Sequence, residues 1–367
     1  MNELLAKANI SIRTNRPLDN PSKVIDVFRR GNFLQMTFQT QGCRYSDIGS
    51  CSMCNYGKGI MHSPKTILQE LEYICRSQDF LETEMVLLGA SGSFLDKKEL
   101  PEELQYDIMK RISQSHMKEI FIETHCNSFS ELTLQKIRKI FSEQCVHIEM
   151  GLETITTEFQ TNILNKIISP ENLKYKIDKI HAYHMFVDLN VLFGMPFLTI
   201  GQQIEDTRKT INWALENGAD DIIIFPINIQ PYTIFEWWYA RKYITVPSLW
   251  GLFALLLNLN DKELMHICLA WYGNRSIFYS HNKKTIIPYS CSECRDSLIS
   301  FYEDFTLNRN LHYRKKSLQE FLHRPFSCNC RQSLLKLLEN NTDNTIVPEW
   351  FSAHKALERW LNEYAAD

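Results

Sequence analysis

Three cysteines stand close together near the start of the chain, in the segment CRYSDIGSCSMC. Seven residues separate Cys43 from Cys51, and two separate Cys51 from Cys54. Three thiolates from one loop can hold three irons of a four-iron cluster and leave the fourth iron open to a ligand. A structural zinc ion needs four ligands, and no fourth Cys or His stands at an obvious spacing nearby. We therefore favour an iron–sulfur cluster over zinc or over unconnected free thiols.

A second group of cysteines lies in the last quarter of the chain. Cys291 and Cys294 form a CxxC pair, and Cys328 and Cys330 form a CxC pair 33 residues further on. Four thiolates suit a structural zinc ion or a second four-iron cluster, and the spacing does not decide between them. We favour the cluster, because the chain already depends on iron–sulfur assembly. Such a cluster can relay electrons, bind substrate or donate sulfur.

The segments that must position these residues alternate between strand and helix. The apolar run Phe33–Thr40 precedes the first cysteine loop, and the alternation continues to Asp220–Gln230. Six strand-to-helix units over about 200 residues indicate a parallel sheet with helical crossovers. Six units are too few for a closed eight-fold barrel, so we predict an α/β fold with a partial (β/α)6 barrel. Sites in such barrels lie at the carboxyl ends of the strands, where the first cysteine loop begins.

The sequence predicts three parts. Residues 1–32 are polar and form an N-terminal extension, 33–235 form the partial barrel, and 236–367 form a C-terminal module with the second cysteine group and a final amphipathic helix. The aromatic run Trp237, Trp238 and Tyr239 can stack on a planar ligand, but such a run more often packs in a core.

Composition limits the function classes. Hydrophobic residues make up 44% of the chain and charged residues 23%, with a net charge of −3 and a pI of about 6.4. These values argue against a general binder of polyanions. No secretory signal is visible, and the longest apolar run, 249–257, is too short to span a bilayer. We expect a cytoplasmic protein, where eleven cysteines favour metal or catalytic roles over disulfides.

Five further segments follow the cysteine loop in a characteristic order: GASGSFLD (89–96), FIET (121–124), IEMGLET (148–154), NVLFGMPFLT (190–199) and FPINIQPYT (225–233). Together with CSMCNYG they make the chain resemble the radical S-adenosylmethionine (SAM) enzymes. The usual motif of that superfamily has three residues between its first two cysteines. The seven found here resemble the branch related to the elongator catalytic subunit, and within it the enzymes of archaeosine formation on tRNA.

The resemblance implies both cofactors and a mechanism. SAM chelates the open iron of a four-iron cluster held by Cys43, Cys51 and Cys54. An electron from the reduced cluster cleaves the sulfonium, and the resulting 5′-deoxyadenosyl radical abstracts hydrogen from a substrate. An electron donor such as ferredoxin or flavodoxin is implied as a partner.

The resemblance also suggests roles for polar residues at the strand ends. Glycine allows close backbone approach and serine offers a hydroxyl, so Gly89, Ser91, Gly92 and Ser93 are candidate SAM contacts, although a plain turn has the same composition. A carboxylate inside a barrel needs a partner. For Glu123, Glu149 and Glu153 that partner is either SAM or a neighbouring Lys or Arg. The amides of Asn190, Asn228 and Gln230 suit a polar substrate, or else form internal hydrogen bonds.

We expect a polar small molecule as substrate, of nucleoside or nucleotide type, with sulfur insertion or exchange as a further reaction if a second cluster is present. A radical lyase acting on a modified tRNA base is the alternative, although the acidic pI and the lack of a recognisable RNA-binding domain speak against it. The competing class is a non-enzymatic iron–sulfur or zinc protein that senses or binds.

Overall fold

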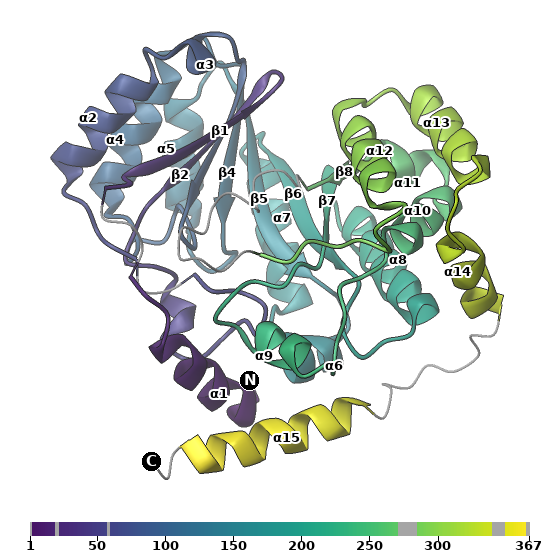
Figure 1. Ribbon diagram of the computed structural model, residues 1–367. Coiled ribbons are helices and arrows are strands. Elements are labelled where there is room, and N and C mark those ends of the chain that lie inside the picture. Colours follow the sequence, from purple (N-terminus) through teal and green to yellow (C-terminus); the bar gives the residue numbers. More distant parts are fainter. Residues whose placement is uncertain (1, 19–21, 57–58, 271–284, 340–348, 365–367) are drawn as a thin grey trace.

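An eight-stranded sheet lies at the centre of the computed structural model, which describes residues 2–18, 22–56, 59–270, 285–339 and 349–364. The strands follow one another in chain order across the sheet. The first pair is antiparallel and every later pair is parallel. The sheet curls into an open half-barrel (Figure 1). Its strands are β1 (Ile25–Arg30), β2 (Phe33–Phe38), β3 (Met85–Ala90), β4 (Glu119–Thr124), β5 (Cys145–Glu153), β6 (Phe186–Phe193), β7 (Asp221–Pro226) and β8 (Ile267–Leu269).

Amphipathic helices connect the parallel strands and cover the outer face of the sheet (Figure 1). Several begin at sequence signals that end the preceding loop: Ser63 and Ser169 cap helices that start with proline, and Thr199 forms a capping box with Gln202. The helices are α2 (Pro64–Ile74), α3 (Gln78–Leu81), α4 (Glu102–Ser113), α5 (Glu131–Ile140), α6 (Thr157–Phe159), α7 (Pro170–Ala182), α8 (Ile200–Glu216), α10 (Leu249–Asn258) and α11 (Asp261–Met265). Two short turns, η1 (Arg44–Ser46) and η2 (Gln160–Leu164), lie in the loops after β2 and β5.

The predicted fold class is confirmed, and the six predicted strands are β2 to β7. The sheet also extends into both neighbouring segments, because β1 lies within 1–32 and β8 lies within 236–367. β1 pairs with β2 through a tight turn at Gly31, whose φ of +56° suits glycine. The proposed boundaries between the three parts stay a prediction.

A second apolar core lies at the end of the sheet where the parallel strands finish. It joins three helices from distant parts of the sequence: α1 (Glu3–Thr14), α9 (Ile234–Ala240) and α15 (Glu349–Tyr364). Leu5, Ala8 and Ile12 of α1 pack in the same core as Ala353 and Leu357 of α15, and Figure 1 shows the two helices near each other below the sheet. The aromatic run of α9 belongs to this core, as its packing interpretation predicted.

The remaining helices, α12 (Arg295–Leu307), α13 (Leu311–His323) and α14 (Cys330–Glu339), lie beside α10 and α8 at the other edge of the sheet (Figure 1). Among the described residues, none of the helices combines the length and the apolar character required to cross a membrane.

Candidate functional site

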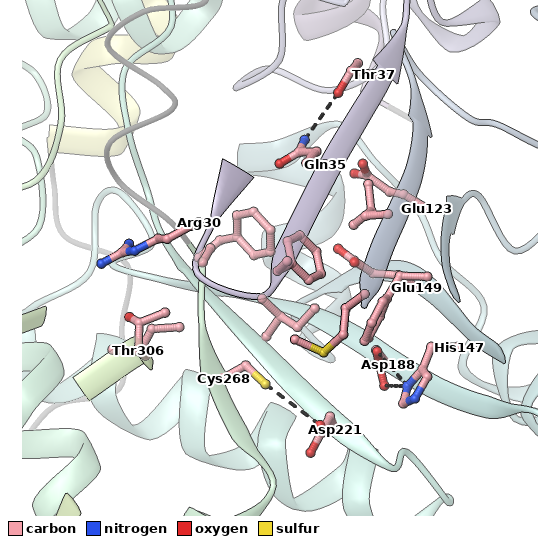
Figure 2. Close-up of a pocket in the computed structure, with 18 of the residues that line it drawn as sticks. Arg30, Gln35, Thr37, Glu123, His147, Glu149, Asp188, Asp221, Cys268 and Thr306 are labelled. Carbon is pink, nitrogen blue, oxygen red and sulfur yellow. Dashed lines mark hydrogen bonds and ion pairs between the residues drawn. The ribbon is translucent and has the colours of Figure 1, made fainter. Parts of the chain in front are cut away.

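The concave face of the half-barrel encloses a cavity of about 690 Å³. Side chains from β1 to β8 line it, because alternate residues of each strand point to the same face. One row of this lining is acidic. Glu123 lies opposite Glu149 in the pairing register, Glu149 lies opposite Asp188, and Asp188 lies opposite Asp221. Figure 2 shows these four side chains on neighbouring strands of the cavity wall.

Protein groups balance part of this negative charge. Both carboxylate oxygens of Asp188 lie 3.2 Å from Nδ1 of His147, and Arg309 forms an ion pair of 2.7 Å with Asp221. Burial alone would lower the pKa of His147, but the hydrogen bond and charge of Asp188 outweigh it, so the pKa is raised. Asn190 donates a hydrogen bond of 2.8 Å to Oε1 of Glu149. The cavity therefore offers carboxylate acceptors to a polar or cationic ligand, and protein groups balance the charge of some of them more than of others.

The first cysteine loop leaves β2 at one end of this cavity. Tyr56 lines the cavity and its carbonyl accepts a hydrogen bond of 3.2 Å from the backbone N–H of Cys43. Burial raises the pKa of Cys54 to about 11, and burial together with the charges of Glu99 and the neighbouring thiols raises that of Cys43. Cysteine binds metal as the thiolate, so bound iron would compensate the negative charge that burial disfavours at Cys43 and Cys54. The donor set thus fits a cluster bound through three thiolates.

The N-terminal helix α1 holds the cysteine loop through one buried arginine. Nη2 of Arg13 donates to the carbonyl oxygens of Ser50, Cys51 and Cys54 at 2.8, 2.8 and 2.7 Å, and Nη1 donates to that of Ser46 at 3.2 Å. Only 6% of the arginine is exposed. A guanidinium presents its donors in a rigid fork, so this single side chain fixes the direction of four loop carbonyls.

The backbone of the cysteine loop is packed just as closely on its other sides. A Cβ atom on Gly49 would lie 2.2 Å from the carbonyl oxygen of Ala6, so α1 approaches the loop at van der Waals contact. A second segment also contacts the loop, because the N–H of Cys51 donates to the carbonyl of Asn165 at 3.2 Å, just after η2. Cys51 itself has a φ of +61°, a left-handed conformation that costs about 1–2 kcal/mol for a residue with a Cβ. These contacts are what hold the cysteine in that conformation.

The Gly-Ser segment after β3 lies against the cysteine loop. A Cβ atom on Gly92 would lie 2.6 Å from Cβ of Cys43 and 2.5 Å from Oε1 of Glu99, so only glycine fits there. The serine hydroxyls tie strand ends together: Ser91 Oγ accepts from the N–H of Thr40 at 3.2 Å, and Ser93 Oγ lies 2.7 Å from Oγ1 of Thr124.

The buried carboxyl group of Glu99 lies beside Gly92, on which Cys43 also packs. Glu99 accepts from the N–H of Ser93 at 3.0 Å through Oε2, whereas its Oε1 is buried without a hydrogen-bond partner. Burial raises the pKa of Glu99 to about 8. An unpartnered buried oxygen beside the candidate cluster ligand Cys43 fits the approach of a hydrogen-bond donor such as the amino group of SAM.

Of the two partners that the sequence left open for Glu153, SAM or a neighbouring cation, the structure shows the cation. Its Oε1 accepts a hydrogen bond of 2.6 Å from Nζ of Lys166, and its own φ is +66°. The opposing charges of Glu153 and of Cys51 outweigh the burial of Lys166 and raise its pKa. The ammonium group of Lys166 thus lies near Cys51, with its charge balanced by Glu153.

The three predicted substrate amides lie in different surroundings. Gln230 lines the cavity, and its Oε1 accepts from the N–H of Asn55 at 3.1 Å, directly after the cysteine loop. Asn190 is hydrogen-bonded to Glu149, and its Oδ1 is buried without a partner. Asn228 is buried near the end of β7. Of the predicted contacts, the structure therefore brings Ser91, Glu123, Glu149 and Gln230 to the cavity, while Gly89 approaches Glu123 and both Gly92 and Glu153 lie at the cysteine loop.

We expect replacement of Gly92 by alanine to reduce iron loading, because the added methyl group would displace either Cys43 or Glu99. The measurement is the iron content per chain after anaerobic reconstitution. Gly31→Ala is the control, since nothing lies within 4 Å of its Cβ position. That change costs about 1 kcal/mol through its positive φ and leaves the iron content unchanged. Equal loading of both variants would contradict the close approach of Gly92 to the cysteine.

His125, just after β4, gives the stability of the apoprotein a pH dependence. Its Nδ1 accepts from the N–H of Asn127 at 3.1 Å, and burial followed by the charges of Lys166 and Arg44 lowers its pKa to about 3. Below about pH 6.5, the ring of His125 is therefore protonated in the unfolded chain but stays neutral in the folded chain. Stability is complete above that pH and falls by about 2 kcal/mol between pH 7 and pH 5.

Urea unfolding of the apoprotein at pH 7, 6 and 5 measures this loss. His125→Gln keeps an acceptor but no titrating ring, so the difference in free energy of unfolding between variant and wild type changes across the range. A constant difference would show that His125 does not titrate as its burial requires.

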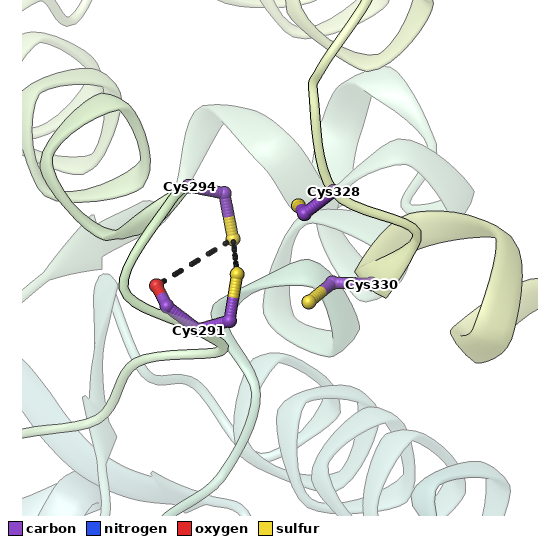
Figure 3. A group of neighbouring side chains, drawn as sticks. All are labelled: Cys291, Cys294, Cys328 and Cys330. Atoms are coloured by element: carbon purple, nitrogen blue, oxygen red, sulfur yellow. Dashed lines mark hydrogen bonds between the residues drawn. The ribbon is translucent and has the colours of Figure 1, made fainter.

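The second cysteine group comes together in space although its pairs are far apart in sequence. The Sγ atoms of Cys291, Cys294, Cys328 and Cys330 all lie within 4.8 Å of one another (Figure 3). Cys294 directly precedes α12 and Cys330 begins α14. The predicted four-cysteine group is thus present, and its four sulfur atoms lie close enough together to bind one metal centre.

Comparison with known sequences gives two relatives over most of the chain, whereas no protein-family model matches it. An uncharacterized protein of Methanocaldococcus jannaschii is 26% identical over 303 residues, which cover 78% of this chain and 80% of the relative. A protein of Methanosarcina acetivorans named archaeosine synthase subunit beta is 26% identical over 285 residues, 76% of this chain and 79% of the relative. The similarity to archaeosine-forming proteins that the motifs predicted is confirmed.

Solved structures give more distant likenesses. Methylornithine synthase aligns with 92% of this chain and 91% of its own at a TM-score of 0.46 and 14% identity. A radical S-adenosylmethionine methyltransferase from Kitasatospora setae covers 57% of this chain and 39% of its own at a TM-score of 0.41 and 14% identity.

Proposed function

We propose that this chain is a radical SAM enzyme that abstracts hydrogen from a polar, nucleoside-type substrate in the half-barrel cavity. The observation that carries the proposal is the position of the three-cysteine loop. Cys43, Cys51 and Cys54 follow β2 at the carboxyl end of a parallel sheet, where a loop residue, Tyr56, also lines a cavity of about 690 Å³. This volume lies within the usual range of about 300–1,000 Å³ for small-molecule pockets.

Bound together, a four-iron cluster and SAM would supply a 5′-deoxyadenosyl radical. The residues of this chain would bind, orient and shield the reactants. Cys43, Cys51 and Cys54 would hold the cluster, and Gly92 leaves the space beside it. Two segments pack closely against the loop, α1 at Gly49 and the residue after η2 at Cys51, and they would limit the access of water to it.

The acidic row would orient the ligands within the cavity. Glu123 and Glu149 stand where a ribose hydroxyl or an amino group can donate to them, while Gln230 joins the cavity to the residue that follows the cysteine loop. Asp188 and Asp221 form ion pairs with His147 and Arg309, at the far end of the row from Glu123. We assign SAM to the side of Glu123 and Ser91, and the substrate to the side of Glu149 and Gln230.

The name of one relative supports the substrate class. A subunit of an archaeosine synthase acts in forming a modified nucleoside, so we propose a nucleoside derivative for this chain and a second subunit as its partner. The net charge of −3 is unsuited to binding a polyanion alone. If the nucleoside belongs to a tRNA, the partner subunit would supply the basic surface.

The test is anaerobic reconstitution with iron and sulfide, followed by dithionite, SAM and candidate nucleosides. We expect 5′-deoxyadenosine to form, and its rate to rise with the correct substrate. Iron binding without any 5′-deoxyadenosine above background, with every candidate present, would favour the sensor or binding class and overturn the enzyme proposal.

A further inference from the structure

We infer that Cys291, Cys294, Cys328 and Cys330 hold a single zinc ion in tetrahedral coordination. The spacing of these cysteines left zinc and a second iron–sulfur cluster open, and the spatial arrangement separates the two. All four Sγ atoms lie within 4.8 Å of one another, and those of Cys291 and Cys294 lie 3.5 Å apart. Four sulfurs at about 2.3 Å from one zinc ion lie about 3.8 Å from each other, which is the scale observed.

A four-iron cluster needs a wider arrangement of the same ligands. Each of its thiolates binds a different iron at a corner of the cube, so the sulfurs point away from the cube and lie roughly 6 Å apart. Every pair in the present site would have to open to admit it. A two-iron cluster also separates two of its thiolates from the other two, because each pair binds a different iron. One ion at the centre of the four sulfurs needs no such rearrangement.

The surroundings of the site favour a structural ion over a redox or substrate centre. None of the four cysteines is among the residues that line the cavity. Instead they lie where two helices begin, Cys294 before α12 and Cys330 at the start of α14. A closed site with four protein thiolates is typical of structural zinc, and such a site has no open position for a ligand.

An ion at this site would connect helices that are far apart in the sequence. Cys294 is fully buried in the core that also contains Trp250 of α10 and Phe321 of α13. The rings of Trp250 and Phe326 meet edge to face with their centres 4.8 Å apart, just ahead of the second cysteine pair. An ion that joins the two pairs therefore fastens α12 and α14 to α10, and through α10 to the outer helix α8 of the half-barrel.

The assignment does not depend on the proposed function, because it concerns different cysteines. The test compares two variants of the full chain, purified anaerobically from cells supplied with iron and zinc. One variant carries Cys43→Ala, Cys51→Ala and Cys54→Ala; the other carries Cys291→Ser and Cys328→Ser. Metal analysis of the first should give about one zinc and no iron per chain. The second should contain no zinc, whatever amount of iron its first cysteine loop binds after reconstitution.

Each other result for the first variant overturns the assignment. About four irons, with the visible absorption of a cluster, would show a second iron–sulfur site. One iron would show a mononuclear iron site, and the absence of both metals would show that the four thiols bind no ion. If the second variant fails to fold, X-ray absorption at the zinc edge of the wild type replaces it. Four sulfurs at about 2.3 Å are expected, and nitrogen or oxygen neighbours would contradict the four-thiolate site.

Discussion

Replacing Cys54 by alanine abolishes the formation of 5′-deoxyadenosine from SAM, if the proposed function is correct. The two remaining thiolates cannot hold three corners of a four-iron cluster. We expect the rate to fall by at least about 1,000-fold, which corresponds to about 4 kcal/mol of transition-state stabilisation. The measurements are the iron content after reconstitution and the chromatographic yield of 5′-deoxyadenosine.

Cys145→Ala is the matched control for this variant. Cys145 is exposed at the start of β5, the end of the strand opposite to the candidate site. It should keep wild-type iron content and activity. A Cys54→Ala protein that retained about four irons and full SAM cleavage would remove Cys54 from the cluster, and with it the main support for the proposal.

Replacing Arg13 by methionine has the second largest expected effect, on both stability and iron loading. The guanidinium donates to four loop carbonyls, and methionine removes all four hydrogen bonds. The carbonyls of Ser46 and Cys51 keep a second donor in the backbone N–H groups of Gly49 and Cys54. Hydrogen bonds from a charged group contribute about 1.5–3 kcal/mol each, and losses are not additive. We therefore expect the free energy of unfolding to fall by about 3 kcal/mol, with incomplete iron loading of a chain that still folds.

Lys7→Met provides a control on the same helix with the same change in charge. Lys7 forms an ion pair of 2.7 Å with Glu3, and the two side chains are 63% and 81% exposed. Removing such an exposed pair changes stability by less than about 1 kcal/mol. Arg13→Lys should lie between the two, because one ammonium cannot reach all four carbonyls. Equal iron loading of Arg13→Met and Lys7→Met would show that the loop holds its shape without the arginine.

The strands of the half-barrel could be predicted from sequence because their cause is local. Each of β2 to β7 is an apolar run followed by a helix with a cap or a periodic face, and the order of such units determines a parallel sheet. β1 was not predicted, because its sequence IDVFRR is half charged and lies at the sheet edge with little burial. α1 carried a readable signal: Leu5, Ala8 and Ile12 have helical spacing and lie buried on one face.

The candidate ligands of the site come from the sequence alone, because cysteine spacing predicts a metal-binding loop by itself. The groups that position them could not be predicted. The contact of Arg13 with Cys54 joins residues 41 positions apart, and that of Cys51 with Asn165 joins residues 114 positions apart. No local sequence pattern distinguishes Arg13 or Lys166 from an exposed arginine or lysine. Likewise, the spacing of the C-terminal cysteines gives the number of thiolates but not the distance between them.

The packing of α15 on α1 has a consequence for the order of biosynthesis. The cysteines of the first loop are translated early, and so is the arginine that orients them. The helix that carries this arginine shares its apolar core with Ala353 and Leu357, which are translated long after the loop. The loop therefore acquires this part of its support only once α15 has been made, so cluster insertion should follow the synthesis of α15.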